Sequence, residues 1–306
     1  MALGALSLFT LFGCATASRV ALDGKEKQIN STQGCAVLRH QEIGADINNS
    51  NMSTTLGASG GLIGSLVGSC IDSGIENSRT KKAALNVVSI RNALNGYDVG
   101  KTFADALHTE LVQTEWLNKI QITGRYVSDA SDLRSWVASI SADAVLVTDM
   151  DYRMTPNFDG ITIYVRASIR AHTPALAALG IAKDDLPAAI YYNQLSIVVH
   201  PPIPPGATKF STEEWIKLWL VDDGKPLRLA LDNGFVEIAK MVAFDLKQPG
   251  TTDGALYKAP SGSETKVASF PLDNGAIGTV KGFVVHTEGL NAWLRMPAGQ
   301  LVSVPK

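Results

Sequence analysis

The stretch from residue 95 to residue 102, NGYDVGKT, ends in the Gly-Lys-Thr that closes a phosphate-binding loop. Such a loop needs the spacing G-x-x-x-x-G-K-[ST], so that a fixed length of backbone wraps the phosphates while the Lys and the hydroxyl reach the oxygens and Mg²⁺. Here the spacing from Gly96 is one residue short, and Asp98 would place a carboxylate where phosphate must bind. We therefore interpret the stretch as a strand-to-helix turn in which Asp98 caps the helix and Lys101 is solvated.

A second group of reactive side chains is acidic and consists of Asp149, Asp151 and Asp159, with Arg153 among them. Asp149 ends the apolar run AVLVTD, as the Mg²⁺-orienting strand of a nucleotide hydrolase would, and the carboxylates could hold a cation or form an acid and base pair. Carboxylates at strand ends are more often solvated or salt-bridged, and we favour that interpretation. The sequence thus predicts no metal site and no cofactor.

Other catalytic signatures are weak. The five histidines are scattered at His40, His108, His172, His200 and His286. Neither an H-E-x-x-H pair nor a G-x-S-x-G elbow occurs. A catalytic triad could assemble from distant positions, but no motif argues for one. An aromatic set could line a partner or glycan surface, although we favour packing in the core; its members are Tyr152, Phe158, Tyr164, Tyr191 and Tyr192.

The amino terminus reads MALGALSLFTLFGC, an uncharged apolar run that ends in Cys14. It resembles a bacterial lipoprotein signal peptide, which implies that residues 1–13 are removed and that the Cys14 thiol takes the lipid. The pattern departs from that family because no Lys or Arg precedes the apolar run. An ordinary cleaved signal peptide or a short anchor is the alternative. Two or more acyl chains anchor a protein stably, and Ala15 after the cysteine implies the outer membrane, facing the periplasm.

Two further cysteines, Cys35 and Cys70, remain after Cys14 is set aside. In an oxidising periplasm they could form a disulfide that closes a loop of about 35 residues and contributes about 3 to 4 kcal/mol. Alternatively they are two unpaired small hydrophobic side chains. An extracytoplasmic location also argues against nucleotide binding at residues 95–102, because we expect no ATP pool there.

Residues 56–71, LGASGGLIGSLVGSCI, carry no charge, and their glycines recur at four-residue spacing. The glycines that would share a helix face are Gly57, Gly60, Gly61, Gly64 and Gly68. The stretch resembles the glycine-zipper segments of bacterial envelope lipoproteins. A helix of about 24 Å is shorter than the ~30 Å hydrocarbon core. Three interpretations stay open: a helix packed on the protein's own domain or a second copy, a membrane-inserted hairpin element, and a flexible glycine loop.

The composition describes a folded chain with no nucleic-acid footprint. Of 306 residues 45% are apolar and 18% charged, and the net charge is −2. No run of basic residues exceeds Lys81-Lys82. Binding to nucleic acid or to an anionic membrane surface is therefore not expected.

Hydrophobic periodicity predicts alternating strands and helices. The expected strands are 85–91, 119–126, 143–150, 161–170 and 193–200, and the expected helices are 98–111, one from about 131, 215–220 and 227–246. Residues 161–170 alternate strictly, so their polar side chains should form one wet face. Ser211 and Glu214 form a capping box. We expect the α/β (α+β) class, with a mixed sheet of about five strands, helices packed on it, a preceding glycine-rich helix and a small β tail. The expected units are a tether at 14–80, an α/β domain at 81–248 and the tail at 249–306.

The element order and the phrase ADAVLVTDMDYRMTPNFDGITIYVRASI resemble the α/β domain of the TolB amino-terminal part and of the curli-secretion lipoprotein. Residues 41–94 resemble uncharacterised bacterial envelope lipoproteins. The second resemblance implies a location and supplies no function. We expect a membrane-anchored, non-enzymatic structural or interaction role with envelope protein partners, which dock on the exposed face of strand 161–170 or an edge beside it. The alternatives are a subunit of an oligomeric outer-membrane export or assembly machine, with self-association of this chain, and a periplasmic hydrolase.

Overall fold

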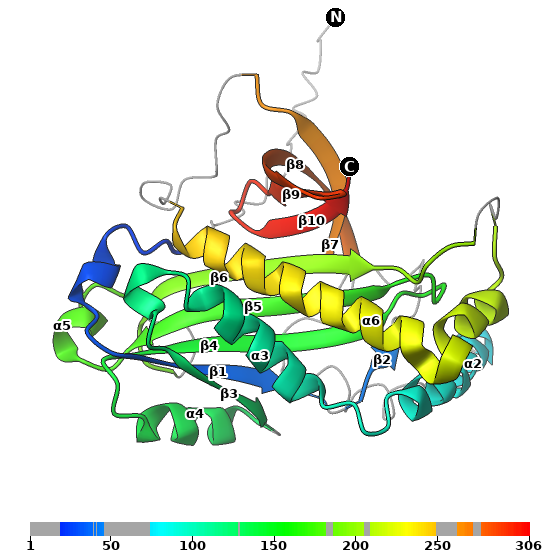
Figure 1. The fold of residues 1–306 in the computed structure, drawn as a ribbon, viewed down its shortest axis with the longest axis horizontal. Helices are drawn as coiled ribbons and strands as arrows, with labels where there is room; N and C mark the ends of the chain where they lie inside the picture. Colours follow the sequence, from blue (N-terminus) through cyan, green and yellow to red (C-terminus); the bar gives the residue numbers. More distant parts are fainter. Residues whose placement is uncertain are drawn as a thin grey trace, which may run out of the picture.

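The computed structural model describes residues 19–38, 40, 42–45, 74–127, 129–181, 186–204, 209–248, 262–271 and 277–306, and all that follows concerns these. Ten strands form one mixed sheet in the order β3-β1-β4-β5-β6-β10-β9-β8-β7, and β2 also pairs with β4 (Figure 1). Pairing is parallel where β1 meets β3 and β4, where β2 meets β4 and where β10 meets β6, and antiparallel elsewhere. The strands are β1 (Thr32–Leu38), β2 (Gly44–Ala45), β3 (Gln121–Tyr126), β4 (Ala144–Met154), β5 (Ile161–Ala171), β6 (Ala189–Val199), β7 (Thr265–Pro271), β8 (Ile277–Glu288), β9 (Asn291–Arg295) and β10 (Leu301–Pro305).

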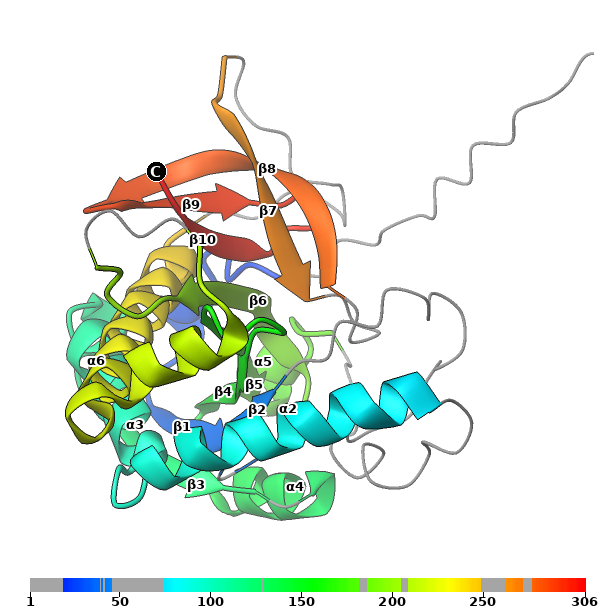
Figure 2. The ribbon, with the colours of Figure 1, turned by 90° about the vertical axis from the view of Figure 1, so that its right-hand side faces the viewer.

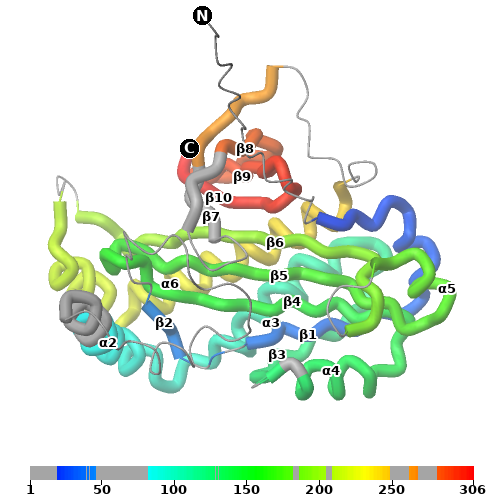
Figure 3. Tube along the Cα trace, turned by 180° about the vertical axis from the view of Figure 1, so that it is seen from behind, coloured from blue at the N-terminus to red at the C-terminus, as the bar shows by residue number. Residues whose placement is uncertain are grey.

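The helices lie on both faces of this sheet. They are η1 (Lys25–Gln28), α2 (Gly74–Ala93), α3 (Val99–Leu111), η2 (Glu115–Leu117), α4 (Ala130–Ser139), α5 (Pro174–Ala177) and α6 (Thr212–Leu246). Helices α3 and α6 cover one face of the central strands, and Figure 3 shows these strands in front of them. Helix α4 packs on the opposite face, against β1 and β4. In Figure 2 the C-terminal strands form a layer on one side of the α/β part, with α2 on the other.

The predicted α/β class is confirmed, but the sheet has about twice the predicted number of strands. Two of the extra strands, β1 and β2, come from the segment that we expected to be a tether. The predicted β tail contains four strands and is continuous with the central sheet, because Leu301 of β10 pairs in parallel with Leu195 of β6. The predicted glycine-rich helix at 56–71 lies outside the described residues.

The predicted strand at 85–91 is wrong, because these residues belong to α2. Val87, Ile90 and Ala93 are buried at helical spacing, whereas Leu85 and Val88 are exposed. The β-branched run locally favours a strand, but burial of one helical stripe against α6 outweighs that weak preference. In chain order β1 takes the place of the strand that we expected first.

Helix α6 consists of two helices joined by a turn. This agrees with the separate helices predicted at 215–220 and 227–246. The Ser211 and Glu214 capping box is present at its start. Residues 221–224 leave helical geometry, and both Asp222 and Asp223 have positive φ, at 49° and 56°. The second helix then lies close on the sheet, since a Cβ on Gly234 would come within 2.5 Å of the Ile163 side chain.

Candidate functional site

The phosphate-loop-like stretch at 95–102 joins α2 to α3, so a helix and not the predicted strand precedes the turn. The Asp98 carboxylate accepts a hydrogen bond from the backbone N–H of Lys101 at 2.9 Å, which confirms the predicted cap. The Lys101 ammonium donates to Asp105 at 2.5 Å, and this contact raises the pKa of Lys101. The Thr102 hydroxyl donates to the Asp98 carbonyl at 2.8 Å. The groups that would bind phosphate are therefore engaged within α3 itself.

Gly100, the second glycine of this stretch, has a packing role. A Cβ on Gly100 would lie 2.9 Å from the Leu38 side chain of β1. A Cβ on Gly124 of β3 would lie 2.6 Å from the carbonyl oxygen of Gly100. Both positions lack a side chain because the start of α3 lies directly on the backbone of the sheet.

Asp149, which the sequence suggested as a Mg²⁺-orienting residue, lies on the face of the sheet opposite to α3. Met150 points toward α3 and shares its hydrophobic cluster with Phe103 and Leu107. Because side chains alternate along a strand, Asp149 points away from α3. It forms an ion pair with Arg166 of β5 at 2.7 Å. The sheet therefore separates Lys101 from Asp149, and the two cannot act on one phosphate group.

Charged and polar residues of β4 and β5 form a surface on this second face, which we call the polar strand face. Its members are Asp149, Asp151, Arg153, Thr162, Tyr164 and Arg166, which lie directly opposite one another in the register Asp149 to Arg166, Asp151 to Tyr164 and Arg153 to Thr162. Arg153 also forms an ion pair with Asp151. Burial disfavours the charge of Arg166, but Asp149, Tyr164 and Tyr192 together outweigh it and raise the pKa of Arg166. The salt-bridged interpretation of these two carboxylates is confirmed.

Asp159 is not part of the polar strand face. It lies in the turn between β4 and β5, where its carboxylate accepts a hydrogen bond from the Thr155 hydroxyl at 2.5 Å. Its backbone carbonyl oxygen lies 2.7 Å from Nδ1 of His200. Asp159 thus shapes the hairpin end, apart from the polar strand face.

The strictly polar face that we predicted for β5 is only partly exposed. Arg166 keeps 47% of its side chain in solvent, but Ser168 and Arg170 are buried. Arg170 donates to the Ser168 hydroxyl at 3.1 Å and to the Pro187 carbonyl at 3.2 Å. The connection that precedes β6 covers the Ser168–Arg170 half of β5. The alternation of residues along β5 alone does not reveal this cover.

The aromatic set serves mainly the core, as favoured. Tyr152, Phe158 and Tyr191 are at most 2% exposed. Tyr192 is also buried, and Tyr164 is half-buried. The Phe158 carbonyl accepts a hydrogen bond from the indole of Trp219 at 2.7 Å, which fixes α6 to the end of the β4–β5 hairpin.

Of the cysteines, Cys35 lies within the described residues, and it is buried in β1 beneath α4. Burial raises the pKa of its thiol to about 12, although the charge of Arg125 acts in the opposite direction. Cys14 and Cys70 lie outside the described residues, as do the predicted packing glycines Gly57, Gly60, Gly61, Gly64 and Gly68. Lipidation, the bridge and the packing face stay predictions.

Sequence reasoning missed a buried charged cluster around Asp245 of α6. Nε of Arg19 donates to both carboxylate oxygens of Asp245 at 3.1 Å, and Nη2 of Arg295 lies 2.5 Å from Oδ1. The Tyr191 hydroxyl and the Asn193 amide donate to Oδ2 at 2.9 and 2.8 Å. Burial alone would raise the pKa of Asp245, but the two guanidinium charges outweigh it and lower that pKa.

This cluster left a signal in the sequence. Ile238, Val242 and Asp245 follow helical spacing, so a carboxylate stands on the apolar stripe of α6. A charge in that position needs a buried partner. Glu237 of the same helix has a related role, because its Oε1 accepts hydrogen bonds from the Trp293 indole at 2.6 Å and the Ser303 hydroxyl at 3.0 Å. Both residues hold the C-terminal strands to α6.

Two clefts open between the described elements. The α2 cleft, of about 330 Å³, lies between α2 and residues 42–43, with Tyr97 and Tyr152 in its wall. Arg91 bridges it by pairing with Glu42 at 2.9 Å and donating to the Ile43 carbonyl at 3.0 Å.

The α6-end cleft, of about 450 Å³, lies between residues 22–26, the start of η2 and the end of α6. Leu22, Trp116 and Leu246 supply its apolar wall. Thr114 also lines this cleft, and its buried hydroxyl has no hydrogen-bond partner among the described residues.

Within the described part of the chain, no three His, Cys, Asp or Glu side chains converge in a way that could bind a metal ion. No helix among the same residues has both the length and the apolar character needed to cross a bilayer. No protein-family model, no curated protein and no solved structure matches this chain.

Proposed function

We propose that this chain is a bacterial envelope lipoprotein, anchored by acylation of Cys14 to the outer membrane and facing the periplasm. Its α/β domain has a structural or protein-interaction role there and carries out no catalysis.

The observation that supports this proposal best is the position of Arg19. Its side chain is only 8% exposed and bonds to Asp245, and it also donates to the Gln248 carbonyl at 2.8 Å. Arg19, the first described residue, is therefore already bonded to the domain although it lies only five positions after Cys14 in the sequence. Residues 1–13 and Cys14 lie outside the described residues, so their removal and the acylation stay part of the proposal.

The polar strand face is the proposed docking surface for an envelope protein. Arg166 is exposed beside the half-buried Tyr164, and Arg and Tyr are among the residue types that dominate interface energies. The surface is limited to residues 162–166 of β5 and the facing part of β4, because Ser168 and Arg170 are buried. Strand β5 lies between β4 and β6, so no free edge lies beside it.

Intact-mass measurement of the protein from bacterial membranes tests the anchor. The mature chain should lack residues 1–13 and be heavier by its acyl chains, and Cys14→Ser should abolish both changes. A photo-cross-linking residue at Arg166 then tests the docking surface in cells. Lys217, exposed on α6, is the matched control position. Equal cross-linking from both positions would contradict the assignment of the surface.

A second candidate is a subunit of an oligomeric outer-membrane export or assembly machine. It is supported by two exposed apolar side chains on α2, Leu85 at 73% and Val88 at 47%. These lie one helical turn apart and follow the glycine segment in the chain. Size measurement of the lipidated protein in mild detergent distinguishes the candidates: an assembly that Leu85→Lys dissociates supports the second, and a monomer supports the first.

A further inference from the structure

The residues around Arg19 form one end of the domain, which we call the α6 end. This end consists of the described residues that surround Arg19, namely the turn at 22–28, the last turn of α6 at 245–248 and the β9–β10 turn at 296–300. The Arg19 backbone N–H donates to the Ala298 carbonyl at 3.3 Å, and a Cβ on Gly299 would lie 2.5 Å from the Arg19 side chain. Arg19 is thus held on two sides, by the end of α6 and by the β9–β10 turn.

Arg19 lies five positions after Cys14 in the sequence, and a fully extended chain spans at most about 3.6 Å per residue. The backbone of Cys14 can therefore be no more than about 18 Å from the backbone of Arg19. The second helix of α6, residues 225–246, measures about 33 Å at 1.5 Å per residue. The opposite end of the domain, where α2 and the start of α6 lie, is consequently beyond the reach of the anchor.

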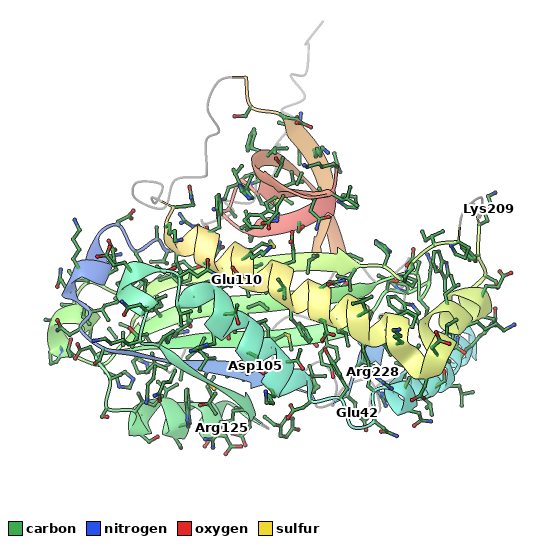
Figure 4. All side chains as sticks on the ribbon, viewed as in Figure 1. Glu42, Asp105, Glu110, Arg125, Lys209 and Arg228 are labelled. Atoms are coloured by element: carbon green, nitrogen blue, oxygen red, sulfur yellow. The ribbon has the colours of Figure 1, made fainter. Side chains whose placement is uncertain are left out.

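We propose that the α6 end faces the lipid headgroups, so that the long axis of the domain stands away from the membrane with α2 and residues 209–211 at its far end. This inference rests on the proposed anchoring of Cys14. In Figure 4 the label of Lys209 marks the far end. In Figure 1 the turn at 25–28, drawn in blue, lies at the opposite end of the long axis.

The side chains of the α6 end suit a headgroup surface. Its charges are mixed, with Asp23, Glu26 and Glu115 against Lys25, Lys27 and Lys247. Such a surface approaches zwitterionic lipid without strong attraction or repulsion. The half-buried Trp116 lines the α6-end cleft beside these charges, and Trp is enriched at the depth of lipid headgroups.

The orientation is tested by fluorescence quenching on vesicles of the zwitterionic lipids phosphatidylcholine and phosphatidylethanolamine. A fluorophore is placed on Lys247→Cys or on Lys209→Cys in the lipidated Cys70→Ser protein, where Cys35 is buried and unreactive. The vesicles contain a lipid with a nitroxide on its headgroup, which quenches only at contact range. Quenching at position 247 should be several-fold greater than at position 209. Equal quenching, or stronger quenching at 209, would overturn the orientation.

A spacer variant separates this inference from the anchor itself. Inserting about 20 Gly and Ser residues after Ser18 adds a mean reach of about 25 Å. The spacer should remove the quenching at 247 while the protein still floats with the vesicles. Quenching that persists at 247 shows that the surface itself holds the membrane, and overturns the role of the short tether. If Cys14 carries no lipid by intact mass, the proposed function fails first and the orientation fails with it.

Discussion

The Cβ that Gly124 lacks would lie 2.6 Å from the carbonyl oxygen of Gly100. Strand β3 and the first turn of α3 therefore touch backbone to backbone, and any side chain at 124 must push them apart. We expect Gly124→Ala to lower the free energy of unfolding by about 1 to 3 kcal/mol, the usual cost of overpacking. Urea denaturation followed by circular dichroism measures this change.

Gly44→Ala is the matched control for that variant. Gly44 is also a strand glycine, but a Cβ there would meet the Arg153 side chain at an ordinary 3.5 Å. Its substitution should change stability by less than about 0.5 kcal/mol. Equal losses in both variants would show that the contact between Gly100 and Gly124 is not what matters at 124.

The Asp245 cluster should dominate the response to single substitutions. Asp245→Asn leaves Arg19 and Arg295 buried without a carboxylate, and breaking such a buried pair costs about 3 to 5 kcal/mol. Tyr191→Phe removes one hydrogen bond to the same carboxylate and should cost about 1 kcal/mol. Thermal and urea unfolding of both variants test the ranking, and similar losses would contradict it.

Acid should weaken the same cluster. The pKa of Asp245 is lowered in the folded protein, so at low pH the unfolded chain binds this proton more readily than the folded one. The stabilisation is fully present above the unfolded value of about 3.9, and it is lost as pH falls through that value toward the folded pKa. The difference in unfolding free energy between wild type and Asp245→Asn should therefore be constant from about pH 7 to pH 5 and shrink near pH 3. A difference that stays constant to the lowest pH would exclude Asp245 as the source.

The Cys35 thiol should be inert in the folded protein. Burial raises its pKa to about 12, and the thiolate is the form that reacts. In Cys70→Ser protein, a maleimide at neutral pH should leave Cys35 unmodified until denaturant is added. In wild type, absence of labelling in denaturant unless a reductant is present would indicate the bridge between Cys35 and Cys70. Rapid labelling of the folded variant would contradict the buried position.

The interpretation of residues 95–102 as a capped turn has its own test. Asp98→Ala removes the cap of α3 and should cost about 1 kcal/mol of stability. Lys101→Ala should have little effect, because its partner Asp105 is also solvent-exposed. If the loop bound nucleotide, removing the Asp98 carboxylate would strengthen ATP binding. Calorimetric titration with MgATP should detect no binding to wild type or to Asp98→Ala.

The parts of the fold that could be predicted are those decided by neighbours in the chain. The Asp98 cap, the Ser211 and Glu214 capping box and the alternation at the start of β5 each follow from a few adjacent residues. Strand β1 was missed because its partners are distant: Cys35 pairs with Thr123 on one side and Val147 on the other. The extent of the sheet was underestimated for the same reason, since nothing near Leu301 indicates that it pairs with Leu195.

The candidate site shows the same division. Separate residues such as Asp149 and Arg153 were recognised as a charged group, but their pairing and the exclusion of Asp159 depend on strand register. Burial of Arg170 depends on the Pro187 connection, which no period along β5 can reveal. The carboxylate at 245 on an apolar stripe was the one readable sign of the buried cluster.

That cluster also imposes an order of events on a chain that emerges amino end first. Asp245 lies 226 residues beyond Arg19, and its second guanidinium arrives only with β9. Until β10 follows, β6 presents an unpaired edge in the middle of the future sheet. The core cannot close around Asp245 until β9 supplies Arg295, so this part of the fold is completed last. A chain that lacks β9 and β10 keeps a carboxylate that cannot be buried and an open strand edge, features by which proteases can distinguish unfinished molecules from finished ones.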